Sequence, residues 1–140
     1  MKTLKINHLA ILTCFVLLTA LGFVWYGPLF GEQWMAMVGL DMAAVEANPP
    51  GASIWITNVV ATLVPLYTLA WLFTKLNVES AGRGAAIGLL IVFAFEFMST
   101  MTGNLFAQNP YGLTWITGGY NLVAIGLSGA ILGGWKKYAA

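Results

Sequence analysis

One acidic side chain, Glu96, lies inside an otherwise uncharged apolar stretch, residues 85–106. A carboxylate near the middle of a bilayer costs about 2.5–3.5 kcal/mol when it faces lipid, so we expect Glu96 to face protein or water. Loss of solvation there favours the neutral carboxylic acid unless a cation approaches. Helical spacing places Ser99 and Thr100 on the same face as Glu96. The pattern predicts a small polar stripe around one carboxyl that could take up a proton or a cation.

Polar side chains in two other apolar stretches are possible partners for Glu96. Asn58 and Thr62 share a helical face with Pro65, which removes a backbone donor from its helix, and Asn121 lies in the last apolar stretch. No Lys, Arg or His lies at comparable depth, so we expect no internal ion pair. Two interpretations remain open: a satisfied network that only fixes helix packing, or a hydrated path or pocket lined by these groups.

A cluster of aromatic residues surrounds the turn that follows the first apolar stretch. Trp25 and Tyr26 precede Pro28, which ends a helix because it lacks an amide donor, and Trp34 follows shortly after. Aromatic belts are general to membrane proteins, so an interfacial anchor is the favoured interpretation. The alternative is a lip formed by these three side chains, which would bind a lipid headgroup or a small ligand.

Catalytic chemistry has little support in the sequence. There is one histidine, His8, and one cysteine, Cys14, which leaves no Ser-His-Asp set, thiol pair or metal-ligand cluster. We therefore expect no metal and no cofactor, and the sequence favours a role other than that of an enzyme. A net charge of +1 gives no field for nucleic acid, so we expect no nucleic-acid partner.

The composition indicates that these residues are positioned by membrane-spanning helices. Of 140 residues, 59% are hydrophobic and only 8% are charged, whereas soluble domains are about 25% charged. A span needs roughly 20 apolar residues. The sequence predicts an all-α polytopic membrane protein, a single domain over residues 1–140, in which four transmembrane helices form an up-down bundle. The predicted spans are residues 8–29, 54–73, 85–106 and 114–135.

The distribution of charge predicts how the chain crosses the bilayer. All six basic residues lie before the first span, between the second and third, or after the fourth. In the long loop after the first span, every charged residue is acidic. The positive-inside rule then places both termini in the cytoplasm and the protein in the cytoplasmic (inner) membrane. A cleaved signal peptide is the rival interpretation, but the first apolar run is long for one and no small-residue cleavage site follows it directly.

Two further features concern the surface of the bundle. Residues 31–40 suit a short amphipathic helix lying at the membrane interface after the first span, or equally a packed cap over the helix bundle. The last span carries Gly119, Gly126, Gly129 and Gly133 on one face, and such a face permits close helix contact. Besides the lipid bilayer, the expected partner is therefore a second copy of the chain, joined through this glycine face.

Three segments of the sequence are distinctive: Ile6-Asn7 before the first span, the run Trp-Tyr-Gly-Pro-Leu-Phe-Gly from Trp25 to Gly31, and the glycine-rich stretch from Ile116 to Trp135. Together they resemble the membrane proteins of domain-of-unknown-function family 1761. The resemblance covers most of the chain and is least distinctive between Asp41 and Ser53. It implies a four-span membrane protein. It implies no activity and no catalytic residues.

Three classes of function follow from these residues. The preferred hypothesis is a small homo-oligomeric transporter or channel-like protein with Glu96 as its protonatable centre. The second is a non-catalytic scaffold or accessory subunit in which Glu96, Asn58 and Asn121 only fix helix packing. A lipid- or quinone-handling enzyme is the third, and it lacks an identifiable reactive group. The substrate is not specified by the sequence.

Overall fold

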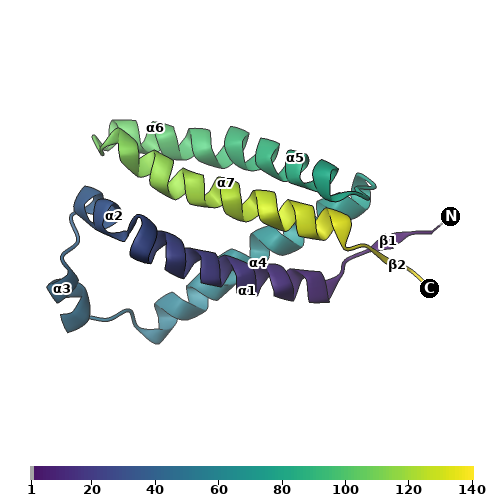
Figure 1. The fold of residues 1–140 in the computed structure, drawn as a ribbon, viewed down its shortest axis with the longest axis horizontal. Coiled ribbons are helices and arrows are strands. Elements are labelled where there is room, and N and C mark those ends of the chain that lie inside the picture. Colours follow the sequence, from purple (N-terminus) through teal and green to yellow (C-terminus); the bar gives the residue numbers. More distant parts are fainter. Residues whose placement is uncertain (1) are drawn as a thin grey trace.

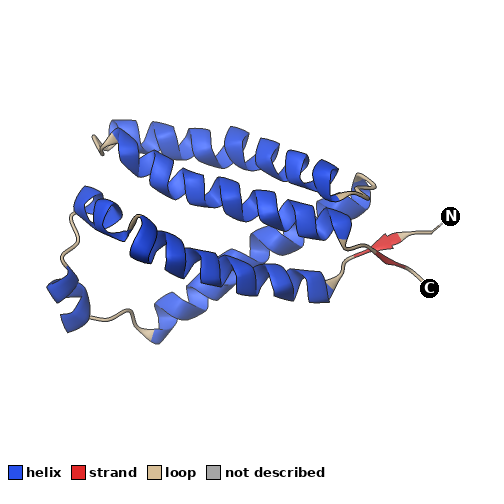
Figure 2. Ribbon diagram, in the orientation of Figure 1, coloured by secondary structure: helices blue, strands red, loops and turns tan. Residues whose placement is uncertain are grey.

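The computed structural model describes residues 2–140, and it is all-α apart from one pair of two-residue strands (Figures 1 and 2). Four helical segments are long and apolar enough to cross a membrane. The first comprises α1 (His8–Val24) and the π-helical turn η1 (Trp25–Leu29), and the second is α4 (Ala52–Lys75). The third joins α5 (Ala81–Ile91), the π-helical turn η2 (Val92–Phe97) and α6 (Met98–Phe106), and the fourth is α7 (Tyr111–Gly134).

Polar caps set several helix starts. The Asn7 side chain accepts from the Ala10 amide at the start of α1, and Ser80 accepts from the Arg83 amide at the start of α5. Such caps satisfy backbone donors that have no partner within the helix. Because Ser80 forms this cap, the third span begins earlier than the apolar stretch alone predicts.

The long loop after the first span contains two short helices, α2 (Gly31–Val38) and α3 (Met42–Ala47). The short helix predicted over residues 31–40 is α2, and it ends at Gly39, whose φ of 71° lies in the left-handed region that glycine adopts without strain. The second helix, α3, was not predicted. Its N-cap is Asp41, whose carboxylate accepts from the Ala43 amide.

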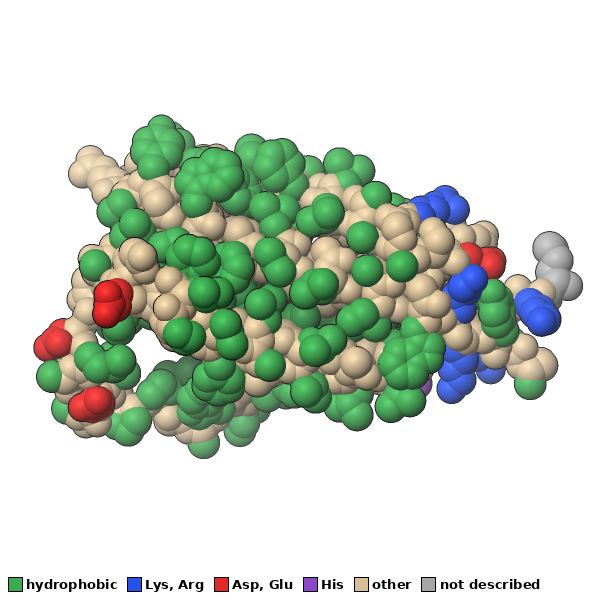
Figure 3. Space-filling view, in the orientation of Figure 1, with side chains coloured by type: hydrophobic (Ala, Val, Ile, Leu, Met, Phe, Trp, Pro, Cys, Tyr) green, Lys and Arg blue, Asp and Glu red, His purple; other side chains and the backbone are tan. Residues whose placement is uncertain are grey.

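Large apolar side chains cover the outside of the helices. Phe95 and Phe106 are 77% and 87% exposed, and apolar side chains extend over the length of the molecule in Figure 3. Lys and Arg gather at the end that carries the termini, where Glu79 also lies against Tyr138, while the other acidic side chains of the surface lie at the opposite end, around α2 and α3 (Figures 1 and 3). An apolar surface this extensive, between two charged ends, is what a bilayer covers. The chain is a small integral membrane protein.

Helix α7 is the most buried of the spanning helices and makes its most extensive contact with α5. The contact is made by glycines: a Cβ added at Gly133 would lie 3.0 Å from the Gly84 Cα, and one added at Gly129 would lie 2.9 Å from the Gly84 carbonyl carbon. Only glycine permits backbones to approach this closely. The glycine face of the last span thus packs within the chain. A homo-oligomer through this face remains a prediction, and α5 would compete for the same surface.

Helix α4 is held at one end only. Its buried side chains, Leu66, Leu69, Ala70 and Phe73, all follow Pro65. From Ala52 to Pro65 no residue is buried. Figure 1 shows α4 crossing behind α1 at an angle, whereas α5, α6 and α7 lie side by side. The half of α4 before Pro65 therefore leans away from the bundle and leaves open space beside α7.

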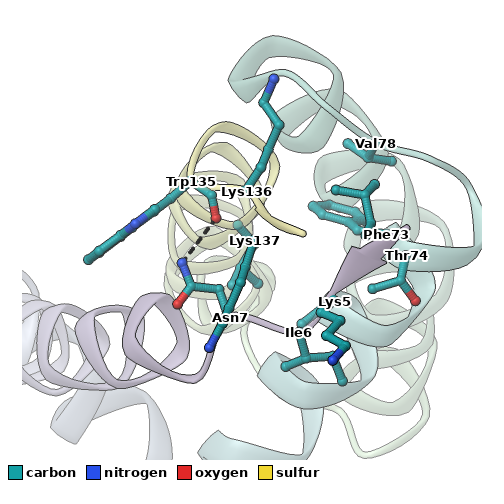
Figure 4. A pocket seen from close by; sticks show the side chains of 12 residues that line it. Lys5, Ile6, Asn7, Phe73, Thr74, Val78, Trp135, Lys136 and Lys137 are labelled. Carbon is teal, nitrogen blue, oxygen red and sulfur yellow. Dashed lines mark hydrogen bonds between the residues drawn. The ribbon is translucent and has the colours of Figure 1, made fainter. Parts of the chain in front are cut away.

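The two ends of the chain are joined. Strand β1 (Leu4–Lys5) pairs antiparallel with β2 (Lys137–Tyr138), and the Asn7 side chain donates to the Trp135 carbonyl at 3.2 Å (Figure 4). The cavity beneath this pair is about 20 Å³, room for roughly one water. These contacts hold both termini at the same end of the molecule, as the charge distribution predicts.

Candidate functional site

The site is centred on a π-helical turn in the third span. Within η2 the Met98 amide donates to the Phe93 carbonyl, five residues earlier, instead of the usual four. Turns of this kind are rare and occur often at functional sites. Phe97 is 1% exposed and its ring lies over Gly118 of α7, where an added Cβ would come within 2.8 Å of the ring. This ring-on-glycine contact seats η2 on α7 and brings Glu96 close to Asn121.

One oxygen of the Glu96 carboxyl is well satisfied and the other is not. The Thr100 hydroxyl and the Asn121 side-chain amide each donate to Glu96 Oε1 at 2.9 Å. Glu96 Oε2 is buried and has no hydrogen-bond partner within residues 2–140. A buried oxygen without a partner is costly whether the carboxyl is charged or neutral. Two donors on one oxygen suit a carboxyl that is either ionised or protonated on the other oxygen.

Glu96 lines a groove between α4, η2 and α7, which we call the carboxyl groove. Its volume is about 540 Å³. Its lining is apolar except for Glu96, Asn121 and Thr68, and it includes no Lys, Arg, His or Asp. The lining residues are Val64, Pro65, Thr68, Leu69, Leu72, Ile91, Val92, Phe95, Glu96, Asn121 and Ile125.

A second groove, of about 560 Å³, lies along the half of α4 that leans away from the bundle. We call it the aromatic groove, because Tyr26, Trp55 and Tyr120 line it together with Asn58 and Thr62 of α4. Asn121 lines both grooves. One side chain of α7 thus lies between the two spaces and donates to the carboxyl in one of them.

The structure brings only some of the predicted polar residues together. Glu96, Thr100 and Asn121 form one hydrogen-bonded cluster. Asn58 and Thr62 line the aromatic groove, where the Thr62 hydroxyl donates to the Asn58 backbone carbonyl. Within residues 2–140 neither of them hydrogen-bonds to the carboxyl of that cluster.

Ser99 is exposed and lines neither groove.

The predicted aromatic residues pack inward against α7. The Trp25 indole donates to the Ile116 carbonyl at 2.9 Å. Tyr26 packs edge-on against Trp34, with ring centroids 5.3 Å apart, and also contacts Tyr120 at 5.5 Å. Trp25 thus fixes η1 to α7, and of the three predicted lip residues Tyr26 alone lines a groove.

Tyr120 is the residue that sequence reasoning missed. Its hydroxyl donates to the Leu18 carbonyl at 2.9 Å, which joins α7 to α1. The available signal was its place directly before Asn121 in the last span. The single histidine and the single cysteine both lie on α1 and line neither groove. The His8 Nδ1 atom lies 3.0 Å from the Tyr67 hydroxyl, and Cys14 is buried. Within residues 2–140 no cluster of His, Cys, Asp or Glu is suited to hold a metal ion.

Neither a curated protein nor a solved structure matches this chain. A family model does: that of the proteins of unknown function grouped as DUF1761, over residues 9–133. The match covers nearly all of the four membrane helices and both grooves, and the family is the one that the sequence resembles. This small four-helix membrane protein therefore belongs to the DUF1761 family.

Proposed function

We propose that the chain is a small transport protein of the cytoplasmic membrane, with both termini in the cytoplasm and Glu96 as its protonatable centre. The observation that carries the proposal is the unpartnered Glu96 Oε2, buried at a groove that no basic side chain lines. Ionisable groups inside a membrane are costly and are usually kept for function. A proton or a bound cation would satisfy the oxygen that the protein itself leaves free.

The shape of the space favours a carrier over a channel. Both grooves lie beside α4, and they share Asn121 in their linings. A groove between helices admits a ligand from the side, and movement of the loosely held half of α4 would change which groove is open. Association of two copies would complete the enclosure that four helices provide only in part.

A scaffold or accessory subunit is the second candidate. The observation in its favour is the pair of hydrogen bonds to Glu96 Oε1, since Thr100 and Asn121 would fix the register of η2 against α7 without any transport. An isosteric amide at position 96 separates the two proposals. It keeps the shape and accepts both hydrogen bonds through its carbonyl oxygen, but it takes up no proton.

The test is proton flux into proteoliposomes that contain purified protein and carry an imposed pH gradient. The wild type should raise the flux above that of protein-free vesicles, Glu96→Gln should abolish the increase, and Glu46→Gln in α3 is the matched control that keeps it. Circular dichroism of each variant checks the fold. A wild-type flux equal to that of empty vesicles, or a folded Glu96→Gln protein with full flux, would exclude Glu96 as a proton-carrying centre.

A further inference from the structure

We propose that the carboxyl groove binds a lipophilic monovalent cation, such as a quaternary phosphonium or ammonium compound with an apolar body, which enters from the bilayer. This inference deepens the proposed function by naming the class of substrate, and it rests on that function. It is carried by one contrast within the groove: an apolar lining around a single acidic group.

Charge complementarity selects the sign of the ligand. Among the groove residues Glu96 is the sole ionisable side chain, and its Oε2 makes no hydrogen bond within residues 2–140. A metal ion would need several oxygen ligands, and the groove offers only the carboxyl, one amide and one hydroxyl. The Thr68 hydroxyl already donates to the Val64 carbonyl. A diffuse organic cation needs no such ligand shell, because its apolar groups contact the walls while its charge lies near the carboxylate.

The size and walls of the groove fit such a compound. Its volume of about 540 Å³ falls within the roughly 300–1,000 Å³ of small-molecule sites. Phe95 also lines the groove, and aromatic faces attract organic cations. The opposite wall comes from α4, where Val64 is 57% exposed and Leu69 is buried. The groove thus has an apolar floor and an edge that opens toward lipid.

A proton and the organic cation would compete for Glu96, because only the ionised carboxyl can pair with a cation. Two titratable groups on the helices around Glu96, Tyr26 of η1 and Tyr120 of α7, line the neighbouring groove. The other titratable groups on these helices are Cys14 and His8 of α1, Tyr67 and Lys75 of α4, Arg83 of α5 and Tyr111 of α7. None of them lines the carboxyl groove.

The experiment measures equilibrium binding of tetraphenylphosphonium to purified protein in lipid nanodiscs, with triphenylphosphine oxide as a neutral compound of similar shape. The wild type should bind the cation saturably and at least tenfold more tightly than the neutral compound. Glu96→Gln should remove that preference, and the matched control Glu46→Gln should keep it. Equal binding of both compounds by the wild type would mean that the groove holds apolar molecules, such as lipid chains, without regard to charge, and would overturn the proposal.

A pair of tryptophan substitutions tests the location without touching the carboxyl. Val64→Trp should fill the groove and weaken cation binding at least tenfold, whereas Val60→Trp, on the same helix but outside both grooves, should not. If Val64→Trp binds like the wild type, the site lies elsewhere. Proton flux that depends on Glu96, together with failure to bind the cation, would overturn this inference and leave the proposed function standing. Loss of both would overturn both.

Discussion

Replacing Gly84 by alanine tests the close packing of α5 on α7, which positions the rest of the site. A Cβ at Gly84 would lie 3.0 Å from the Gly129 carbonyl carbon and 3.1 Å from the Gly133 Cα, and closer still to the Gly129 carbonyl oxygen. Carbon atoms pack at about 3.5–4.0 Å. The obstructing atoms belong to the backbone, so no side chain can rotate away and the two helices must separate.

The expected cost follows from this geometry. Forcing an extra methyl group into a well-packed contact costs about 1–3 kcal/mol, and exchange of a helical glycine for alanine returns about 1 kcal/mol of helix propensity. Gly103→Ala in α6 is the matched control, because nothing lies within 4 Å of its added Cβ. The propensity gain is similar in both variants, so Gly84→Ala should be less stable than Gly103→Ala by about 1–3 kcal/mol.

The assay is unfolding in mixed micelles by titration with sodium dodecyl sulfate, followed by circular dichroism and tryptophan fluorescence. The two alanine variants and the wild type are compared under one set of conditions. Equal stability of Gly84→Ala and Gly103→Ala would refute the backbone contact between α5 and α7.

Two further predictions concern the aromatic residues. Trp25→Phe removes the donor to the Ile116 carbonyl, so it should lower the free energy of unfolding by about 1 kcal/mol in the same assay. Trp55→Phe, on the exposed half of α4, is the control. Equal effects of the two substitutions on the free energy of unfolding would contradict the role given to this bond. Burial and the Glu79 carboxylate, to which the Tyr138 hydroxyl donates at 3.1 Å, raise the pKa of Tyr138. The contribution of this contact to stability is therefore complete below about pH 10, the usual tyrosine pKa, and is lost as the pH rises through the higher pKa of the folded state. The difference in tyrosinate absorbance between the wild type and Tyr138→Phe should titrate above about pH 10. Titration at or below about pH 10 would count against the contact.

The helices were predictable because their signal is composition summed over long windows. Four uncharged or nearly uncharged stretches required four spans, and the structure has them. The strand pair that joins the termini was not predictable, because Leu4–Lys5 and Lys137–Tyr138 are too short to carry a pattern and pair across the whole length of the chain. The helix α3 depends on one cap, Asp41, in a stretch without a clear period.

The candidate site was predictable in some of its residues but not in its geometry. A carboxyl inside a span is visible in the sequence, as is the chance that Asn121 meets it. The π-helical turn η2 is not visible, because it depends on how Phe97 seats over Gly118. Nor does the sequence show that α4 is anchored only after Pro65, since apolar residues occupy both sides of that proline.

The central claim is that Glu96 is a protonatable carboxyl that can be reached from the lipid side. It is tested most directly by treating the lipid-reconstituted protein at neutral pH with dicyclohexylcarbodiimide, a hydrophobic reagent that modifies protonated carboxyls, and locating the adduct by mass spectrometry. We predict modification at Glu96 and none at the water-exposed carboxyls of Glu32, Asp41, Glu46 and Glu79. A folded protein that remains unmodified at Glu96 would contradict the claim and identify this carboxyl as a sequestered part of the packing between η2 and α7.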